Sequence, residues 1–244
     1  AIKLGLGRIG SSPFSDEELK ALRGRWASLL PSRAMALCVP ERQPFYLGLI
    51  GQTLELLSDP DFSIYMDGKD SFWNGVPVGF DEPLPRVPEL YPKKEKVRPL
   101  DDSEYNNMAT NYKSAREMAD DLEKKFCEEE QLGRMIPTTV GEMKSKFPHR
   151  TPLVAAMGAL RKPNGDVRPL HDGTHYVQLN NAILFQDQLQ YPGPEDAAGM
   201  VRTVKEEQES VYALSADIKA AHRLVKIREE DWPLLGCKVR SEDK

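Results

Sequence analysis

The 244-residue sequence has few cysteines, no long apolar run and no overall excess of basic residues. Cys38, Cys127 and Cys237 are far apart and form no Cys-x-x-Cys pair, which argues against a disulfide framework or a zinc ribbon and indicates a reducing compartment. No apolar run approaches the ~18 residues that a membrane span needs, and no charged-then-apolar signal peptide opens the sequence. We therefore expect an intracellular protein, in the cytoplasm or nucleus, with no membrane partner.

The formal net charge is −5, so no global basic field points to a nucleic-acid or membrane partner. Local charge is more informative. Residues 114–130 hold seven acidic side chains against three basic ones, a net charge of −4, and residues 144–176 hold six basic side chains against two acidic ones, a net charge of +4. The second stretch is the one that could face phosphate.

Gly5, Gly7 and Gly10 match the dinucleotide-binding pattern Gly-x-Gly-x-x-Gly. That motif needs a helix starting inside it, whereas Gly10 runs into Ser11-Ser12-Pro13, which signals a turn. No series of alternating strands and helices follows. A flexible leader is the simpler interpretation, and a dinucleotide-binding enzyme remains an alternative.

Two helices are expected in the first part of the chain. Ser15 and Glu18 form a capping box before apolar residues at helical spacing, and a second helix is expected from about Pro44 to Leu57. From about residue 60 to 105, Pro, Gly, Asp and aromatic residues crowd together, which is typical of a long irregular connection. We interpret residues 1–110 as a helical and irregular region of unknown role.

Two more capping boxes follow. Ser114 and Glu117 predict the start of a helix that Gly133 closes, and Thr139 and Glu142 predict a short helix ending near Phe147.

The basic stretch contains a predicted hairpin. The apolar segments 153–160 and 167–170 flank a turn that contains Asn164-Gly165, a strong hairpin signal. This arrangement places Arg161 and Lys162 at the tip and Arg168 on the returning strand. Clustered cations on a hairpin suit a triphosphate, and the alternative is ordinary surface charge on a solvated turn.

Near the C-terminal end, the apolar segment 211–216 predicts a strand that ends at Asp217. Because an unpaired buried carboxylate costs several kcal/mol, such a residue lies at the edge of a sheet, pairs with a base or binds a metal. The alternative is a cap of the next turn. His171, Asp172 and His175 form a weaker metal candidate, since Gly173 argues against a helix and no third ligand of suitable spacing is near.

These pieces occur in a defined order. Together they resemble a reverse transcriptase, an RNA-directed DNA polymerase of the kind carried by retroelements with long terminal repeats or a tyrosine recombinase. The residues that carry the resemblance are Thr151 to Val154, Arg161-Lys162, Asn164-Gly165, Arg168, Asp172, Leu179-Asn180 and, further along, Ser215 to Leu224 around Asp217.

The resemblance implies an α+β fold in which residues 111–244 form the fingers and a partial palm of a polymerase-like right hand. It implies two-metal nucleotidyl transfer, with Mg²⁺ bound by Asp217 and the carbonyl of Ile218. Arg161 or Lys162, together with Arg168, would grip a deoxynucleoside triphosphate, and the nucleic-acid partner would be an RNA or DNA template-primer. His222 stands where the family has Phe or Tyr against the sugar.

The family needs further carboxylates from a Tyr-x-Asp-Asp hairpin, and no such motif occurs between Asp217 and Lys244. One carboxylate cannot hold two divalent ions, so we expect this chain to be a truncated piece that does not polymerise alone. The alternative function is a non-catalytic nucleic-acid-binding or scaffold module with a degenerate polymerase fold. Its binding would be salt-sensitive, would depend on the hairpin cations and would not respond to Mg²⁺.

Overall fold

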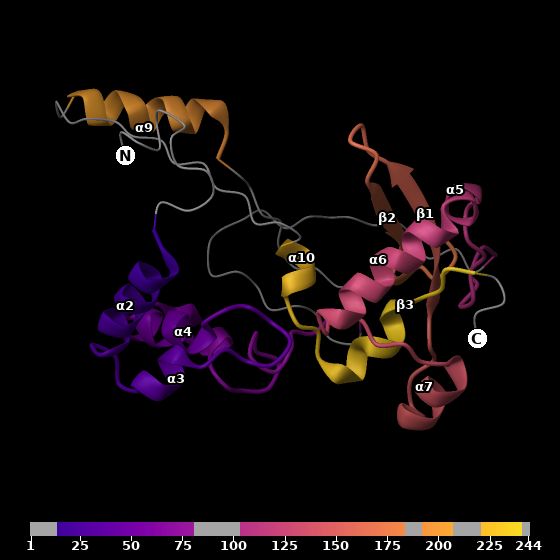
Figure 1. Ribbon diagram of the computed structural model, residues 1–244, viewed down its shortest axis with the longest axis horizontal. Helices are drawn as coiled ribbons and strands as arrows, with labels where there is room; N and C mark the ends of the chain where they lie inside the picture. Colours follow the sequence, from indigo (N-terminus) through magenta and orange to yellow (C-terminus); the bar gives the residue numbers. More distant parts are fainter. Residues whose placement is uncertain (1–13, 81–102, 184–191, 207–220, 241–244) are drawn as a thin grey trace. The chain divides into compact units, whose positions relative to one another are not determined.

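The computed structural model describes residues 14–80, 103–183, 192–206 and 221–240. It is a mixed α+β chain, as expected from the sequence, and its sheet is small and three-stranded (Figure 1). The chain divides into two compact units. The helical unit comprises residues 1–76, 131–134 and 223–229, and the sheet unit comprises the rest. None of the described helices combines the length and apolar character needed to cross a bilayer.

The helical unit is built on short helices, which are α2 (Asp16–Ala27), α3 (Arg33–Leu37), α4 (Leu47–Leu56) and the 3₁₀ helix η1 (Pro60–Tyr65). The predicted capping box is present, since the Ser15 hydroxyl accepts from the Glu18 N–H and the Glu18 carboxylate accepts from the Ser15 N–H. Ala27, Leu30 and Ala36 form the core, and two alanines among them let the helices approach closely.

A later segment of the chain completes this unit. Val76 forms a parallel bridge with Ile227, and Arg228 pairs with Asp70 at 3.0 Å. Gly75 has φ +121°, and a Cβ at this position would lie 2.5 Å from the backbone nitrogen of Arg228. The close approach of the two segments therefore requires glycine here.

The remaining elements are α5 (Lys113–Glu117), α6 (Ala119–Gln131), α7 (Val140–Lys146), β1 (Val154–Arg161), β2 (Val167–Asp172), α8 (Leu179–Ala182), α9 (Pro194–Glu206), α10 (Ala221–Leu224), the 3₁₀ helix η2 (Glu229–Leu235) and β3 (Gly236–Cys237). The strand order is β2-β1-β3, with β1 antiparallel to β2 and parallel to β3. The capping box of Thr139 and Glu142 begins α7, as predicted.

The core of the sheet unit lies against β1. Helices α5 and α6 lie alongside the β1–β2 pair (Figure 1), and Leu122 of α6 packs with Met157 and Val167. A second cluster surrounds Leu153 and Leu234. The apolar side chains of α5 and α6 therefore face the hairpin.

The predicted cap at Ser114 is wrong. Ser114 lies inside α5, whose N-cap is Tyr112, and its hydroxyl accepts a hydrogen bond from the N–H of Ala159 in β1. The helix is also broken at Met118, which has φ −117° and separates α5 from α6. The hydroxyl bonds to β1 and not to the helix terminus, because the buried N–H of Ala159 needs a hydrogen-bond partner.

Asn111 joins three parts of the sheet unit. Its side chain is buried, and its Oδ1 accepts from the N–H of Met157 at 2.9 Å. Its Nδ2 donates to the carbonyls of Lys238 and Val239 at 2.8 and 2.9 Å. A single amide therefore connects β1 to the segment after β3.

Asp231 is another buried polar anchor of this unit, with no exposed surface. Its carboxylate accepts from the N–H of Val78 at 2.8 Å and pairs with Arg150 at 3.4 Å. The guanidinium of Arg150 also lies 5.9 Å from the centre of the Phe80 ring. The 3₁₀ helix η2 is thus tied to two distant segments.

Candidate functional site

The predicted hairpin is confirmed, and its turn is defined in detail. The N–H of Gly165 donates to the carbonyl of Lys162, so Pro163 and Asn164 are the central residues of the turn. Gly165 follows with φ +84°, and the N–H of Lys162 donates to the carbonyl of Asp166. Proline suits the first central position of such a turn, and glycine supplies the left-handed residue that ends it.

This turn sets the register of the two strands. Arg161 pairs with Val167, and Leu160 pairs with Arg168. Because successive side chains of a strand point to opposite faces, Arg161 and Arg168 lie on opposite faces of the hairpin. The basic side chains predicted to act together therefore do not converge on one surface.

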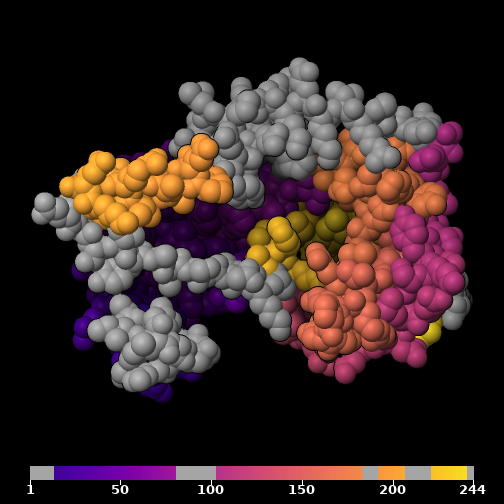
Figure 2. Space-filling view, turned by 90° about the horizontal axis from the view of Figure 1, so that it is seen from above, coloured from indigo at the N-terminus to yellow at the C-terminus, as the bar shows by residue number. Residues whose placement is uncertain are grey.

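Arg161 lies on the face covered by α6. Its guanidinium pairs with Asp121 of α6 at 2.8 Å and donates to the carbonyl of Gly165 at 3.0 Å. Both members of the ion pair are about half exposed. In Figure 2 the magenta surface of α5 and α6 adjoins the orange surface of the hairpin.

Lys162 is at the tip, and it pairs with Asp166 at 3.7 Å. Asp166 also pairs with Lys125 of α6 at 3.1 Å, and Lys125 pairs with Glu128 at 3.3 Å. The hydrogen bond from Lys125 lowers the pKa of Asp166, and in turn the carboxylate raises the pKa of Lys125. The tip of the hairpin is therefore part of a mixed-charge network rather than a purely basic surface.

Arg168 is exposed on the opposite face, and it forms no hydrogen bond or ion pair with any residue that the structure describes. Leu160 and Leu170 share this face and are 54% and 43% exposed. A cation thus stands beside exposed aliphatic side chains on an open face of the sheet.

Of the other predicted site residues, only His222 lies within the described part of the chain. Asp217 and Ile218 lie outside the described residues, as do Gly5, Gly7 and Gly10 of the alternative dinucleotide motif. His222 lies in α10 with an exposed side chain, and it makes no hydrogen bond or ion pair within the described part of the chain.

Asp121 and Lys125 were missed by sequence reasoning. Both belong to the acidic stretch 114–130, which pairs with the basic stretch through α6 and the hairpin. The opposite net charges of the two stretches indicate that they can pair. The residues involved can be named only once α6 is placed against the hairpin.

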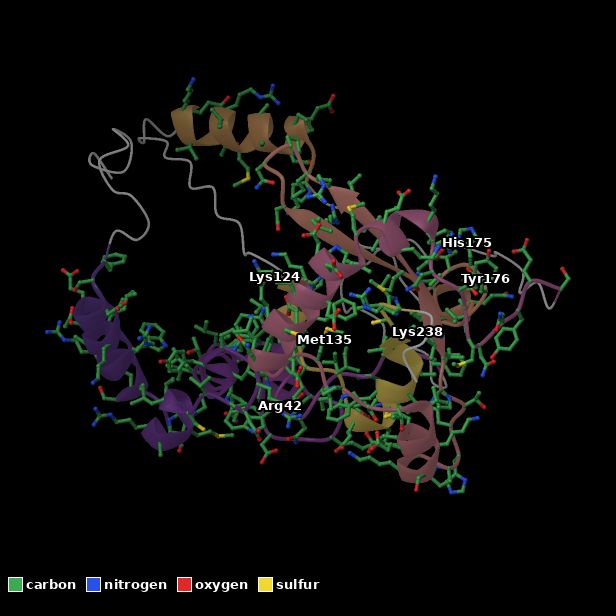
Figure 3. All side chains as sticks on the ribbon, turned by 45° about the vertical axis from the view of Figure 1, so that its right-hand side comes forward. Arg42, Lys124, Met135, His175, Tyr176 and Lys238 are labelled. Carbon is green, nitrogen blue, oxygen red and sulfur yellow. The ribbon has the colours of Figure 1, made fainter. Side chains whose placement is uncertain are left out.

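A second group of polar residues gathers around Asp172, the last residue of β2. The Tyr112 hydroxyl donates to its Oδ2 at 2.5 Å, and Nδ1 of His175 lies 2.9 Å from the same oxygen. Oδ1 accepts from the backbone N–H groups of Thr174 and His175 at 2.9 and 3.1 Å. Figure 3 shows His175 and Tyr176 next to each other in the loop after β2.

These hydrogen bonds set the ionisation of the cluster. Partial burial alone would raise the pKa of Asp172, but the hydrogen bonds from Tyr112, His175 and Thr174 outweigh it and lower the pKa to about 2. The hydrogen bond to this carboxylate, together with burial, raises the pKa of Tyr112 to about 12. At neutral pH an ionised carboxylate and a neutral phenol face each other.

Beside this cluster is a pocket of about 460 Å³. It is lined by the side chains of aromatic, polar and acidic residues, including Glu104, Tyr105, Asn106, Tyr112, His175 and Tyr176. Among the described residues that line it there is no Lys or Arg.

Within the described residues, no three His, Cys, Asp or Glu side chains are grouped so that they could hold a metal ion. The Asp172 and His175 pair is instead satisfied by internal hydrogen bonds. A scan of protein-family models and searches of curated proteins and of solved structures give no match to this chain.

Proposed function

We propose that this chain contributes the nucleotide-binding fingers hairpin and one metal-binding carboxylate of an RNA-directed DNA polymerase. The β1–β2 hairpin binds the triphosphate of a deoxynucleotide, and the partner nucleic acid is a template-primer. The order of the motifs in the sequence supports this function, from the hairpin cations to Asp217.

The observation that carries the proposal is the environment of Arg168. This side chain is exposed on an open face of the sheet, has no ion-pair partner among the described residues, and is flanked by Leu160 and Leu170. A guanidinium binds phosphate oxygens bidentately, while aliphatic side chains beside it contact the base or sugar. A nucleotide offers both kinds of surface.

Arg161 and Lys162 contribute in a second way. Their carboxylate partners, Asp121 and Asp166, are partly exposed. Exposed ion pairs of this kind stabilise a protein by about 0–1 kcal/mol, so a triphosphate with several negative charges can displace them. We expect Arg161 and Lys162 to strengthen binding less than Arg168 does, because each must first give up a partner and because Arg161 lies on the opposite face of the hairpin, from which it attracts the triphosphate only at longer range.

The metal ion of this reaction would be Mg²⁺. Asp217 and the carbonyl of Ile218 are oxygen donors, which Mg²⁺ prefers, and they would leave most of its six positions to water and phosphate. The ion supplies charge neutralisation of the leaving pyrophosphate when it is bound. The residues of the chain position the nucleotide, and the resemblance implies that His222 lies near the sugar.

The test is calorimetric binding of dTTP to the chain with and without Mg²⁺. Arg168→Ala is expected to weaken binding about tenfold, as the loss of a charge-assisted hydrogen bond predicts. Arg202→Ala on α9 removes the same charge from another exposed site and is the matched control. Asp217→Ala is expected to abolish the Mg²⁺ dependence and leave the metal-free affinity unchanged.

Equal loss in Arg168→Ala and Arg202→Ala would contradict the proposal, because it would mean that only net charge matters. Binding of RNA or DNA that is salt-sensitive, depends on Arg161, Lys162 and Arg168, and ignores Mg²⁺ would favour the non-catalytic module instead. Primer extension by the natural gene product that survives Asp217→Ala would also rule out the mechanism.

A further inference from the structure

The pocket beside the Asp172 cluster has features that the proposed function does not use. It measures about 460 Å³, which is within the range of small-molecule sites. The described residues that line it belong to the sheet unit, and none of them is a hairpin cation.

Three tyrosines line this pocket, and their rings are available to a ligand. Tyr105, Tyr112 and Tyr176 are 50%, 39% and 40% exposed. None of these rings stacks on another ring or lies under a cation among the residues that the structure describes. Three exposed tyrosines around one pocket are unusual, because soluble proteins rarely expose large aromatic side chains side by side.

One of these tyrosines, Tyr176, has an energetically unfavourable backbone conformation. Tyr176 has φ +58°, a left-handed conformation that is uncommon for a residue with a large side chain. The turn is secured by a hydrogen bond from the N–H of Asn106 to the carbonyl of Tyr176 at 3.0 Å. Strain of this kind is found where the surrounding structure fixes a side chain for binding.

Among the described residues, the charge around the pocket is negative. Glu104 lines it, and the ionised carboxylate of Asp172 lies behind Tyr112 and His175. Because Tyr112 donates its hydroxyl proton toward that carboxylate, its ring is richer in electrons and attracts a cation more strongly. The same negative charge repels phosphate, which disfavours a nucleotide or a nucleic-acid backbone here.

We propose that this pocket binds an organic ammonium group, such as a trimethylated lysine side chain or a choline-type headgroup. Tyr105, Tyr112 and Tyr176 provide the aromatic faces, and Glu104 provides the nearest carboxylate. The proposal does not depend on the polymerase function, since it uses none of the hairpin cations.

The test compares choline with 3,3-dimethylbutan-1-ol, which has the same shape and no charge. Binding is followed by calorimetry and by the NMR shifts of the His175 ring. Choline is expected to bind at least about tenfold more tightly, because the cation–ring attraction is absent from the neutral compound. A short peptide carrying trimethyllysine is measured beside the unmodified peptide, and tighter binding of the peptide than of choline identifies a protein partner as the source.

Variants make the test specific to the site. Tyr105→Ala and Glu104→Gln are expected to weaken choline binding about tenfold and about threefold, whereas Tyr105→Phe keeps the ring and the affinity. Phe14→Ala removes an equally exposed aromatic side chain from outside the pocket and is the control. Equal binding of choline and the neutral alcohol would overturn the proposal. So would an affinity unchanged in both Tyr105→Ala and Glu104→Gln, or preferential binding of a nucleoside.

Discussion

The Tyr112 hydroxyl donates a 2.5 Å hydrogen bond to Oδ2 of Asp172 and joins the residue before α5 to the end of β2. The pair lies beside Gly158, where a Cβ would be 3.7 Å from Cδ2 of Tyr112. A Cβ at this distance would make an ordinary van der Waals contact with the ring, so the Tyr112 ring packs over this part of β1 while its hydroxyl reaches the carboxylate.

This pair predicts part of the acid sensitivity. The folded state lowers the pKa of Asp172 from 3.8 to about 2, so its stabilising contribution is fully present above about pH 4 and is lost as the pH falls toward 2. Tyr112→Phe should bring this pKa back toward 3.8, destabilise the protein at pH 6 by about 1 kcal/mol and flatten its loss of stability between pH 4 and 2. Urea unfolding from pH 2 to 7 measures this, and parallel profiles for the two proteins would contradict it.

The ion pair of Asp121 and Arg161 predicts a gain of nucleotide affinity on removing an acid. Asp121→Asn releases Arg161, so the affinity for Mg²⁺-dTTP should rise about threefold, with a change in unfolding free energy within about 0.5 kcal/mol. Asp120→Asn is the matched control, because Asp120 lies next to it on α6 and pairs with Arg240 instead. An equal gain in both variants would show that only the net charge of α6 matters.

The buried carboxylate of Asp231 predicts a large stability effect. Asp231→Ala leaves the N–H of Val78 unpaired and the charge of Arg150 without this partner, and should cost about 3 kcal/mol. Asp231→Asn keeps an acceptor for Val78 and should cost less. Glu230→Ala removes an exposed carboxylate from the same 3₁₀ helix and should change stability by under about 0.5 kcal/mol. Thermal unfolding followed by circular dichroism ranks the three variants.

Alanine substitutions at two glycines with positive φ should lower the free energy of unfolding by different amounts. Gly75→Ala forces a Cβ to within 2.5 Å of the backbone of Arg228 and should cost about 3 kcal/mol or more. Gly165→Ala, at φ +84° with no atom within 4 Å of the added Cβ, should cost about 1 kcal/mol. Unfolding in guanidinium chloride measures the stability of the two variants. Similar losses would mean that the backbone conformation alone, and not the close contact at Gly75, determines the loss of stability.

The helix starts at Ser15 and Thr139 and the presence of the hairpin were predictable from the sequence. Each depends on residues within a few positions of one another, so the local pattern contains the information. Ser114 shows where this fails. The residues around Ser114 have the pattern of a capping box. Its hydroxyl instead accepts a hydrogen bond from the N–H of Ala159, 45 residues further along the chain.

The register of the hairpin was the harder part of the site. If Asn164 and Gly165 were the two central residues of the turn, Arg161 would stand directly opposite Arg168 on one face. The turn is instead centred on Pro163 and Asn164, which shifts the pairing by one residue and separates the two guanidinium groups onto opposite faces. The sequence pattern is compatible with both turns, and only the observed turn places Arg161 on the α6 face and Arg168 on the other face.

The side chain of Asn111 has a consequence for the order in which the chain folds. It reaches acceptors 127 and 128 residues further along while it also pairs with β1. During synthesis, therefore, the Asn111 amide cannot form all of its hydrogen bonds until residues 238 and 239 have been added. The segment before α5 and the hairpin are made well before that point. Contacts of such sequence separation slow folding, so the sheet unit should close late and should stay exposed to proteases until its last strand arrives.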